Sequence, residues 1–163
     1  MQGYKMGAIL CGAIILQSTI LPHLKVKEAG LDLILIVVVY NGLYLNIQQA
    51  PLYGFLGGLA EDIFSGFLLG SNALSKTIIG FLIVAIERKI YKDNIITPGL
   101  LIFLVTLLEG VIFTFIFFIL RVQFSPVKHW QTVVVPGAFY NSLAGTLMFF
   151  IFKKIEKRRR FSR

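Results

Sequence analysis

The chain has few residues of the kinds that build metal centres, disulfide-stabilised domains or soluble enzymes. Its 163 residues include one cysteine, two histidines and eight acidic residues. The single cysteine, Cys11, excludes an internal disulfide and a cysteine-based metal site, so we expect it to be an apolar filler in the first helix. Only 15% of the residues are charged and 56% are hydrophobic, a composition typical of a polytopic membrane protein.

Sequence motifs of catalysis, cofactor binding and metal binding are also missing. We find no G-x-S-x-G, no phosphate-cradling glycine loop and no H-E-x-x-H. The two histidines, His23 and His129, are isolated in predicted loops, which is a poor basis for a metal site. We therefore expect no enzymatic activity, no catalytic residues, no cofactor and no metal.

The hydrophobic residues gather in six runs, which predict an all-α, polytopic membrane protein with six transmembrane helices in one bundle. The first run lacks a small-x-small cleavage site, so we interpret it as an uncleaved helix rather than a signal peptide. Residues 1–152 form the transmembrane domain, and residues 153–163 form a basic cytoplasmic tail. The predicted helices cover residues 6–21, 31–45, 51–70, 72–86, 98–120 and 131–152.

The basic residues are unevenly distributed, although the net charge is +8. Six crossings put both termini on one side, which then carries eleven of the sixteen Lys and Arg residues. The positive-inside rule predicts a multi-pass protein of the bacterial plasma membrane with both termini cytoplasmic. This placement argues against a nucleic-acid partner. The tail is expected to bind the anionic bilayer surface or an acidic cytoplasmic protein through Lys153, Lys154, Lys157, Arg158, Arg159 and Arg160.

The third predicted helix carries a small or acidic residue at every fourth position. Each step of four turns about 40° around an α-helix, so the row wraps slowly and forms a continuous groove. Small residues at this spacing let another helix backbone approach closely within a membrane. We predict that a partner helix packs along this groove, which consists of Gly54, Gly58, Asp62, Gly66 and Gly70.

Two adjacent acids, Glu61 and Asp62, make the same helix costly in lipid. Its apolar side chains contribute about −3 to −5 kcal/mol to insertion, whereas two ionised acids at the centre cost about +5 to +7 kcal/mol. The helix therefore needs neighbours, a protonated carboxyl or a basic partner. We interpret it as a packed interface. The alternative, in which the acids only satisfy local polar groups inside a bundle, stays open.

Five polar residues are predicted to lie within the membrane: Glu61, Asp62, Lys76, Glu109 and Asn141. Lys76 lies one turn into the fourth helix, so its side chain can reach Asp62 or Glu61 across a depth of about 6 Å. Such a buried ion pair would fix the helix register more than it would stabilise the fold. The rival interpretation is a proton or ion relay through carboxylates in series. Asp32, at the start of the second helix, is expected to be a cap or a solvated charge.

Residues 51–80 resemble the MreD family of bacterial rod shape-determining proteins. That family has a glycine-rich helix with one acid, a short turn and a characteristic start of the next helix. Here the stretch reads G-F-L-G-G-L-A-E-D-I-F-S-G-F-L-L-G-S-N-A-L, and Gly80 follows it. Glu61, beside the expected acid, departs from the family pattern. The residues that match are Gly54, Gly58, Asp62, Gly66, Gly70, Asn72, Ala73 and Leu74.

The resemblance implies a non-enzymatic membrane scaffold subunit of the elongasome, the machinery of cell shape and peptidoglycan elongation. Its partners would be an MreC-like bitopic scaffold, an MreB-like actin filament, RodA and a class B penicillin-binding protein. A homo-oligomer is compatible with the sequence. The resemblance also implies a fold similar to the substrate-binding subunits of energy-coupling-factor vitamin transporters. The alternative function is therefore a small-ligand-binding subunit of a vitamin-type transporter, with its pocket among helices three to six.

Overall fold

A computed structural model describes residues 3–19, 29–44, 47–66, 68–90, 94 and 96–161, and every element in these ranges is helical. The predicted all-α class is confirmed. Short 3-10 segments, η2 (Ile47–Gln49) and η3 (Glu87–Lys89), and a π-helical segment, η4 (Trp130–Val134), join or interrupt the α-helices. The α-helices are α1 (Gly3–Thr19), α2 (Leu33–Tyr44), α3 (Ala50–Ser65), α4 (Ser71–Ile86), α5 (Ile96–Ile119), α6 (Pro126–His129) and α7 (Val135–Phe161).

The short helix α2 lies at the centre of the molecule. Residues 34–39 are all buried, with at most 2% of their surface exposed. A helix that is apolar on every side is typical of such a central position. One side of α2 packs against Leu10 of α1 and Tyr53 of α3, and the other packs against Ile79 of α4 and Val105 of α5.

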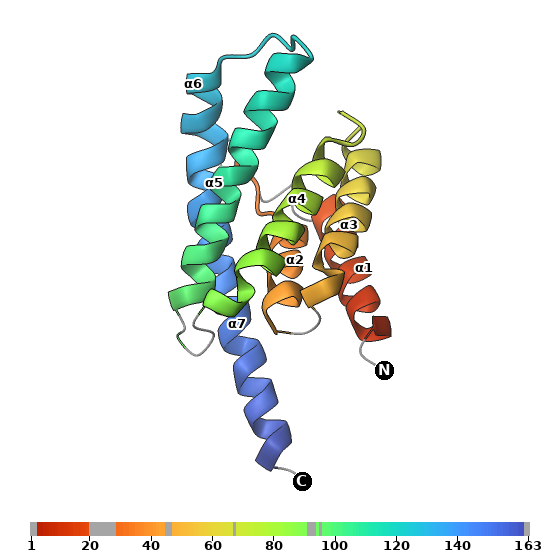
Figure 1. Ribbon diagram of the computed structural model, residues 1–163, viewed down its shortest axis with the longest axis vertical. Coiled ribbons are helices and arrows are strands. Elements are labelled where there is room, and N and C mark those ends of the chain that lie inside the picture. The colour runs from red at the N-terminus through yellow and green to blue at the C-terminus, as the bar shows by residue number, and fades with distance from the viewer. Residues whose placement is uncertain are drawn as a thin grey trace.

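Four of the other helices form two antiparallel pairs, α3 with α4 and α5 with α7, and α1 packs against α2 and α3 (Figure 1). Because α6, η4 and α7 follow one another without a break, the described residues make six helical rods that alternate in direction. The start of α1 and the end of α7 lie at one end of the molecule, which we call the terminal end. The hairpin between α5 and α6 rises beyond α1–α4 at the opposite end, which we call the far end.

Two helix boundaries differ from those predicted. The third helix was expected to reach residue 70, but α3 ends at Ser65 because Gly66 adopts the left-handed conformation, with φ of 63°. The Gly66 N–H donates to the carbonyl of Asp62 at 3.1 Å, a common helix C-cap. The last helix begins at Pro126 and continues to Phe161, so the backbone of the basic tail is helical this far.

A π-helical turn precedes Pro136 in the last helix. The Val135 N–H donates to the carbonyl of Trp130, five residues earlier. Pro136 has no N–H with which to continue the α-helical ladder, and the wider turn occurs where that ladder is interrupted. The interruption of the ladder at Pro136 therefore takes the form of a π turn before the proline.

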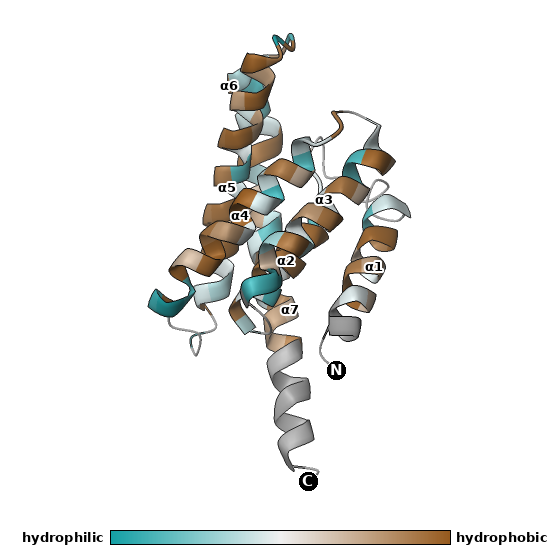
Figure 2. Ribbon diagram, turned by 45° about the vertical axis from the view of Figure 1, so that its right-hand side comes forward, coloured by the Kyte–Doolittle hydropathy of each residue, from teal (hydrophilic) through white to brown (hydrophobic). Residues whose placement is uncertain are grey.

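Two rods are long and apolar enough to cross a membrane, Ile96–Ile119 and Pro126–Ile151. The helices α1 to α4 have 12 to 17 residues, which corresponds to about 18–26 Å against a hydrocarbon core of about 30 Å. Of the six predicted membrane spans, two therefore correspond to helices of sufficient length. Figure 2 shows that hydrophobic residues cover much of α3, α4 and α5, with hydrophilic residues concentrated toward the helix ends.

Candidate functional site

The side chain of Lys76, in the first half of α4, is the centre of a buried polar network and has 0% exposure. Its Nζ lies 2.8 Å from Oδ2 of Asp32, 2.9 Å from Oε2 of Glu61 and 2.9 Å from Oε1 of Glu109. It also donates to Oδ1 of Asn72 at 3.0 Å. An ammonium group has three hydrogens. Four oxygens therefore compete for three donors, and the network has an excess of acceptors.

The three carboxylates reach Lys76 from three different parts of the chain. Asp32 precedes α2, Glu61 lies in α3 and Glu109 lies in the middle of α5. Three carboxylates against one ammonium leave a formal charge of −2 when all are ionised. Asp32 also accepts from the Leu35 N–H at 2.8 Å. The predicted capping role of Asp32 is therefore confirmed, but the residue is also an ion-pair partner, which the sequence analysis missed.

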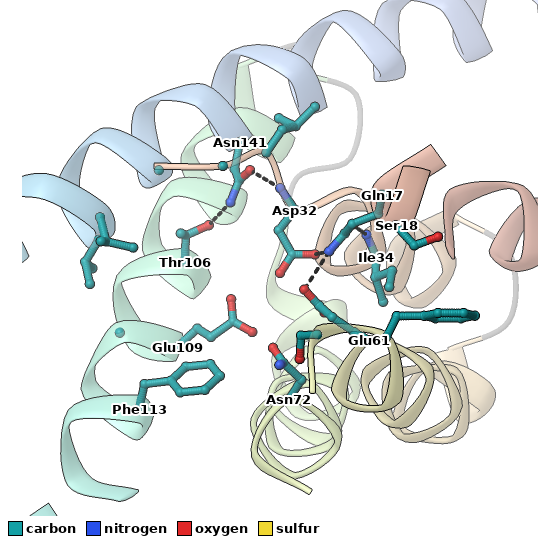
Figure 3. Close-up of a pocket in the computed structure, with 18 of the residues that line it drawn as sticks. Gln17, Ser18, Asp32, Ile34, Glu61, Asn72, Thr106, Glu109, Phe113 and Asn141 are labelled. Carbon is teal, nitrogen blue, oxygen red and sulfur yellow. Dashed lines mark hydrogen bonds between the residues drawn. The ribbon is translucent and has the colours of Figure 1, made fainter. Parts of the chain in front are cut away.

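Two amide side chains extend the network to the outer helices. Gln17 of α1 donates from Nε2 to Oε1 of Glu61 at 2.7 Å. Asn141 of α7 accepts the Asp32 N–H at 2.8 Å and donates from Nδ2 to the Thr106 hydroxyl at 3.3 Å (Figure 3). Each amide uses one end to hold a carboxyl-bearing residue, so the acids are fixed in position before any ligand arrives.

Asp62 faces the start of α4 and caps it from outside the helix. Its carboxylate accepts the backbone N–H groups of Gly70, Asn72 and Ala73 at 2.9, 3.0 and 3.1 Å, and only 1% of the residue is exposed. The N-terminus of a helix favours an anion, because its first N–H groups lack partners and its dipole is positive there. Asp62 is thus satisfied by the turn between α3 and α4 and not by Lys76.

All five predicted intramembrane polar residues belong to this one network. Pairing of Lys76 with Glu61 is confirmed, whereas pairing of Lys76 with Asp62 is wrong. Asn72 connects the two parts, since its Nδ2 donates to Asp62 at 2.9 Å while its Oδ1 accepts from Lys76. Counting Gln17 and Asn141, the network reaches all six rods. The residues that the sequence analysis left out of the site are Gln17, Asp32, Asn72, Ser75 and Thr106.

The glycines of α3 and of the turn after it are used in packing and turning this chain, not in packing a partner helix. A Cβ atom added at Gly54 would meet the carbonyl of Lys76, and one added at Gly58 would meet the carbonyl of Asn72. Gly66 and Gly70 have positive φ angles of 63° and 94° and form the turn. The groove that we assigned to a partner helix is therefore filled by α4 at Gly54 and Gly58, because the helical hairpin folds back on its own small residues.

A cavity of about 510 Å³ lies beside the network toward the far end of the molecule. Asp32, Glu61 and Glu109 line it together with Phe113 and other apolar side chains. Figure 3 shows Glu109 and Phe113 next to each other on α5, across the cavity from Asp32 and Glu61. This size falls in the range of small-molecule sites, about 300–1,000 Å³. The alternative function predicted a pocket among the third to sixth helices, whereas this cavity is also lined by Ile14 and Gln17 of α1 and by Asp32 before α2.

Other predicted positions lie apart from the network or outside the described residues. His129 lines the cavity and packs its ring against Phe117 and Phe124, with centroids 5.9 and 6.0 Å away. Cys11 is exposed on α1 rather than buried as a filler. His23 lies outside the described residues, as do the side chains of Lys153, Lys154, Lys157, Arg158, Arg159 and Arg160.

Comparison with known proteins gives one match. The model of the family described as rod shape-determining protein MreD matches residues 4–158, nearly the whole chain. No curated protein and no solved structure matches, so the similarity to vitamin-transporter subunits stays a prediction. MreD proteins are membrane proteins that determine cell shape, and they are not a known enzyme family. A match of this extent establishes that the chain belongs to the MreD family.

Proposed function

We propose that this protein is an integral membrane scaffold of the peptidoglycan elongation machinery that holds helices of partner proteins. Membership of the MreD family carries the proposal. The Lys76 network supports it, because one buried ammonium group joins Asp32, Glu61 and Glu109 from three helical segments. A bundle whose helices are held together by buried ion pairs can present rigid outer surfaces to partner helices.

We further propose that all six rods cross the plasma membrane, with both termini cytoplasmic. The rods alternate in direction, and the start of α1 and the end of α7 share the terminal end (Figure 1). Large apolar side chains on the outside of the short helices support crossing, since lipid or a partner helix would cover them. Examples are Phe55 of α3 and Phe81 of α4, which are 45% and 63% exposed.

The outer face of α3 is our candidate surface for the transmembrane helix of an MreC-like partner. The glycine face of α3 is occupied by α4, so a partner has to use the opposite side. Four side chains are exposed there by 45–62%: Leu52 and, three, four and eleven positions after it, Phe55, Leu56 and Ile63. This spacing makes a stripe into which a second helix can insert its side chains. The MreB-like filament, RodA and the class B penicillin-binding protein are proposed as partners from the family relationship.

Co-purification in a mild detergent tests the proposed surface. The double variant Phe55→Ala with Leu56→Ala removes the two middle side chains of the stripe. We expect the yield of the MreC-like partner to fall about tenfold, because a few central contacts carry most of an interface's affinity. Leu143→Ala with Leu147→Ala is the matched control on α7, where both side chains are similarly exposed. Equal partner yields from both double variants would refute the assignment to α3.

A further inference from the structure

One carboxylate oxygen of Glu109, beside the cavity, has no donor in the part of the chain that the structure describes. Glu109 uses Oε1 to accept from Lys76 at 2.9 Å and from the Ser75 hydroxyl at 3.2 Å. Its Oε2 accepts no hydrogen bond from the residues that the structure describes. The side chain is nevertheless 91% buried, being 9% exposed, and points into the cavity in Figure 3. An acceptor on a largely buried side chain that borders a cavity and has no protein donor is suited to receive one from a ligand.

The charges around the cavity favour a positively charged ligand. Lys76 does not line the cavity, whereas Asp32, Glu61 and Glu109 do. A ligand in the cavity therefore meets the three carboxylates directly, whereas the ammonium group that partly neutralises them does not face the cavity. One added positive charge reduces the formal charge of the cluster from −2 to −1. In a poorly hydrated site this compensation is worth far more than it is in water.

The aromatic lining of the cavity favours an organic cation over a metal ion. Phe64, Phe113 and Phe117 contribute aromatic rings to it. Phe113 follows Glu109 by one helical turn, so ring and carboxylate lie on the same face of α5. An aromatic face attracts an ammonium or guanidinium group, particularly where water is excluded. The point where the three carboxylates converge is already held by Lys76, so a metal ion would have to displace that side chain.

From these observations we infer that the cavity binds a guanidinium or primary ammonium group, which donates to Oε2 of Glu109 and packs against Phe113. The group belongs either to a free organic cation or to an Arg or Lys side chain of a partner protein. The cavity lies toward the far end, opposite the termini. If both termini are cytoplasmic, as proposed above, the ligand enters from the outer side of the membrane.

Calorimetric titration of the detergent-solubilised chain with benzamidinium tests this inference. Benzamide is the matched neutral probe, with the same ring and nearly the same shape. We expect benzamidinium to bind at least about tenfold more tightly than benzamide, because a hydrogen bond to a charged partner is stronger than a neutral one. Equal affinity, or no binding of either probe, would overturn the inference, and this comparison needs no variant.

Variants test whether the probe binds at Glu109 and Phe113, and a titration of the complex distinguishes a free cation from a partner side chain. Glu109→Gln should abolish the preference for benzamidinium, and Phe113→Leu should weaken binding while leaving every carboxylate in place. Glu87→Gln, at an acid of η3 that does not line the cavity, should bind like the wild type.

The complex with the MreC-like partner is titrated in parallel. A basic side chain of that partner in the cavity would block benzamidinium in the complex, whereas a free cation as the natural ligand would leave the complex able to bind. Unchanged binding in both Glu109→Gln and Phe113→Leu would refute the site.

Discussion

The ammonium group of Lys76 lies 2.9 Å from Oε1 of Glu109, although 33 positions separate the two residues in the sequence. This contact joins the helical hairpin α3–α4 to the long rod α5. Asp32 joins the same ammonium group from the start of α2. The contact stabilises the packing of these segments, because removing Lys76 would leave the carboxylates of Asp32 and Glu109 without their cation.

Replacing Lys76 by methionine should therefore destabilise the protein strongly. Three carboxylates would lose their shared cation, and breaking a buried ion pair on one side typically costs about 3–5 kcal/mol. Unfolding of the detergent-solubilised protein, followed by circular dichroism during a denaturant titration, measures the loss. Lys128→Met, at an exposed lysine of α6, is the control and should change stability by less than about 0.5 kcal/mol. Equal effects of the two substitutions would contradict a central role of Lys76.

The double variant Lys76→Met with Glu109→Leu should be more stable than the sum of the two single effects. Lys76→Met alone leaves three carboxylates without their cation, whereas the double variant leaves only Asp32 and Glu61. Residues in one network usually couple by about 0.5–3 kcal/mol. The same unfolding assay gives the coupling free energy from the four proteins of the cycle. Additive single effects would show that the contact between the two side chains contributes nothing of its own.

Asp62→Ala should destabilise the turn between α3 and α4 by about 2–4 kcal/mol, because three backbone N–H groups, one of them buried and two half-buried, lose their acceptor. Asp62→Asn keeps one acceptor oxygen and should cost less. The order of stability, wild type above Asn above Ala, is measured by thermal unfolding. A tolerated Asp62→Ala would mean that the cap is dispensable.

Gly58→Ala should destabilise the protein by about 1–3 kcal/mol, since a methyl group has no room beside the backbone of α4. The loss should occur in the isolated chain, without any partner present. Gly12→Ala on α1 meets no atom within 4 Å and should be neutral or stabilising by up to about 1 kcal/mol. If Gly58→Ala leaves the isolated chain as stable as Gly12→Ala does, the packing of α3 on α4 is not as described.

Cysteine labelling tests the proposed topology. In a Cys11→Ala background, Gln123→Cys lies in the turn after α5 and Lys89→Cys lies in η3, and both native side chains are exposed. We expect a membrane-impermeant maleimide to label residue 123 in intact spheroplasts and residue 89 only after lysis, as the positive-inside rule requires. The reverse pattern would place both termini outside.

Several features of the fold follow directly from the sequence. Apolar runs interrupted by polar loops predict helices, and the helical class is the class observed. The pairing of Lys76 with Glu61 was predictable because a short turn fixes the relative depth of residues on either side of it. The family relationship was also readable, since a glycine and acid pattern at residues 54–74 sits within a match over residues 4–158.

Other features depended on contacts between distant segments. Glu61 and Asp62 are neighbours in sequence, yet one belongs to the Lys76 network and the other caps α4, because adjacent residues on a helix point about 100° apart. Asp32 and Gln17 looked like residues of helix ends, and their part in the network depends on where α1 and α2 pack. The occupant of the α3 groove was misassigned for the same reason, since a small-residue stripe does not specify which helix fills it.

The sequence by itself determined that this chain is helical, that it carries acids and one lysine where they need partners, and that it belongs to the MreD family. Only the tertiary structure decided which acid meets the lysine, which glycines face α4, and that a cavity with a carboxylate wall lies beside them. The reason is that helix formation depends on neighbours a few residues apart, whereas the pairing of buried charges depends on helices brought together from distant parts of the chain.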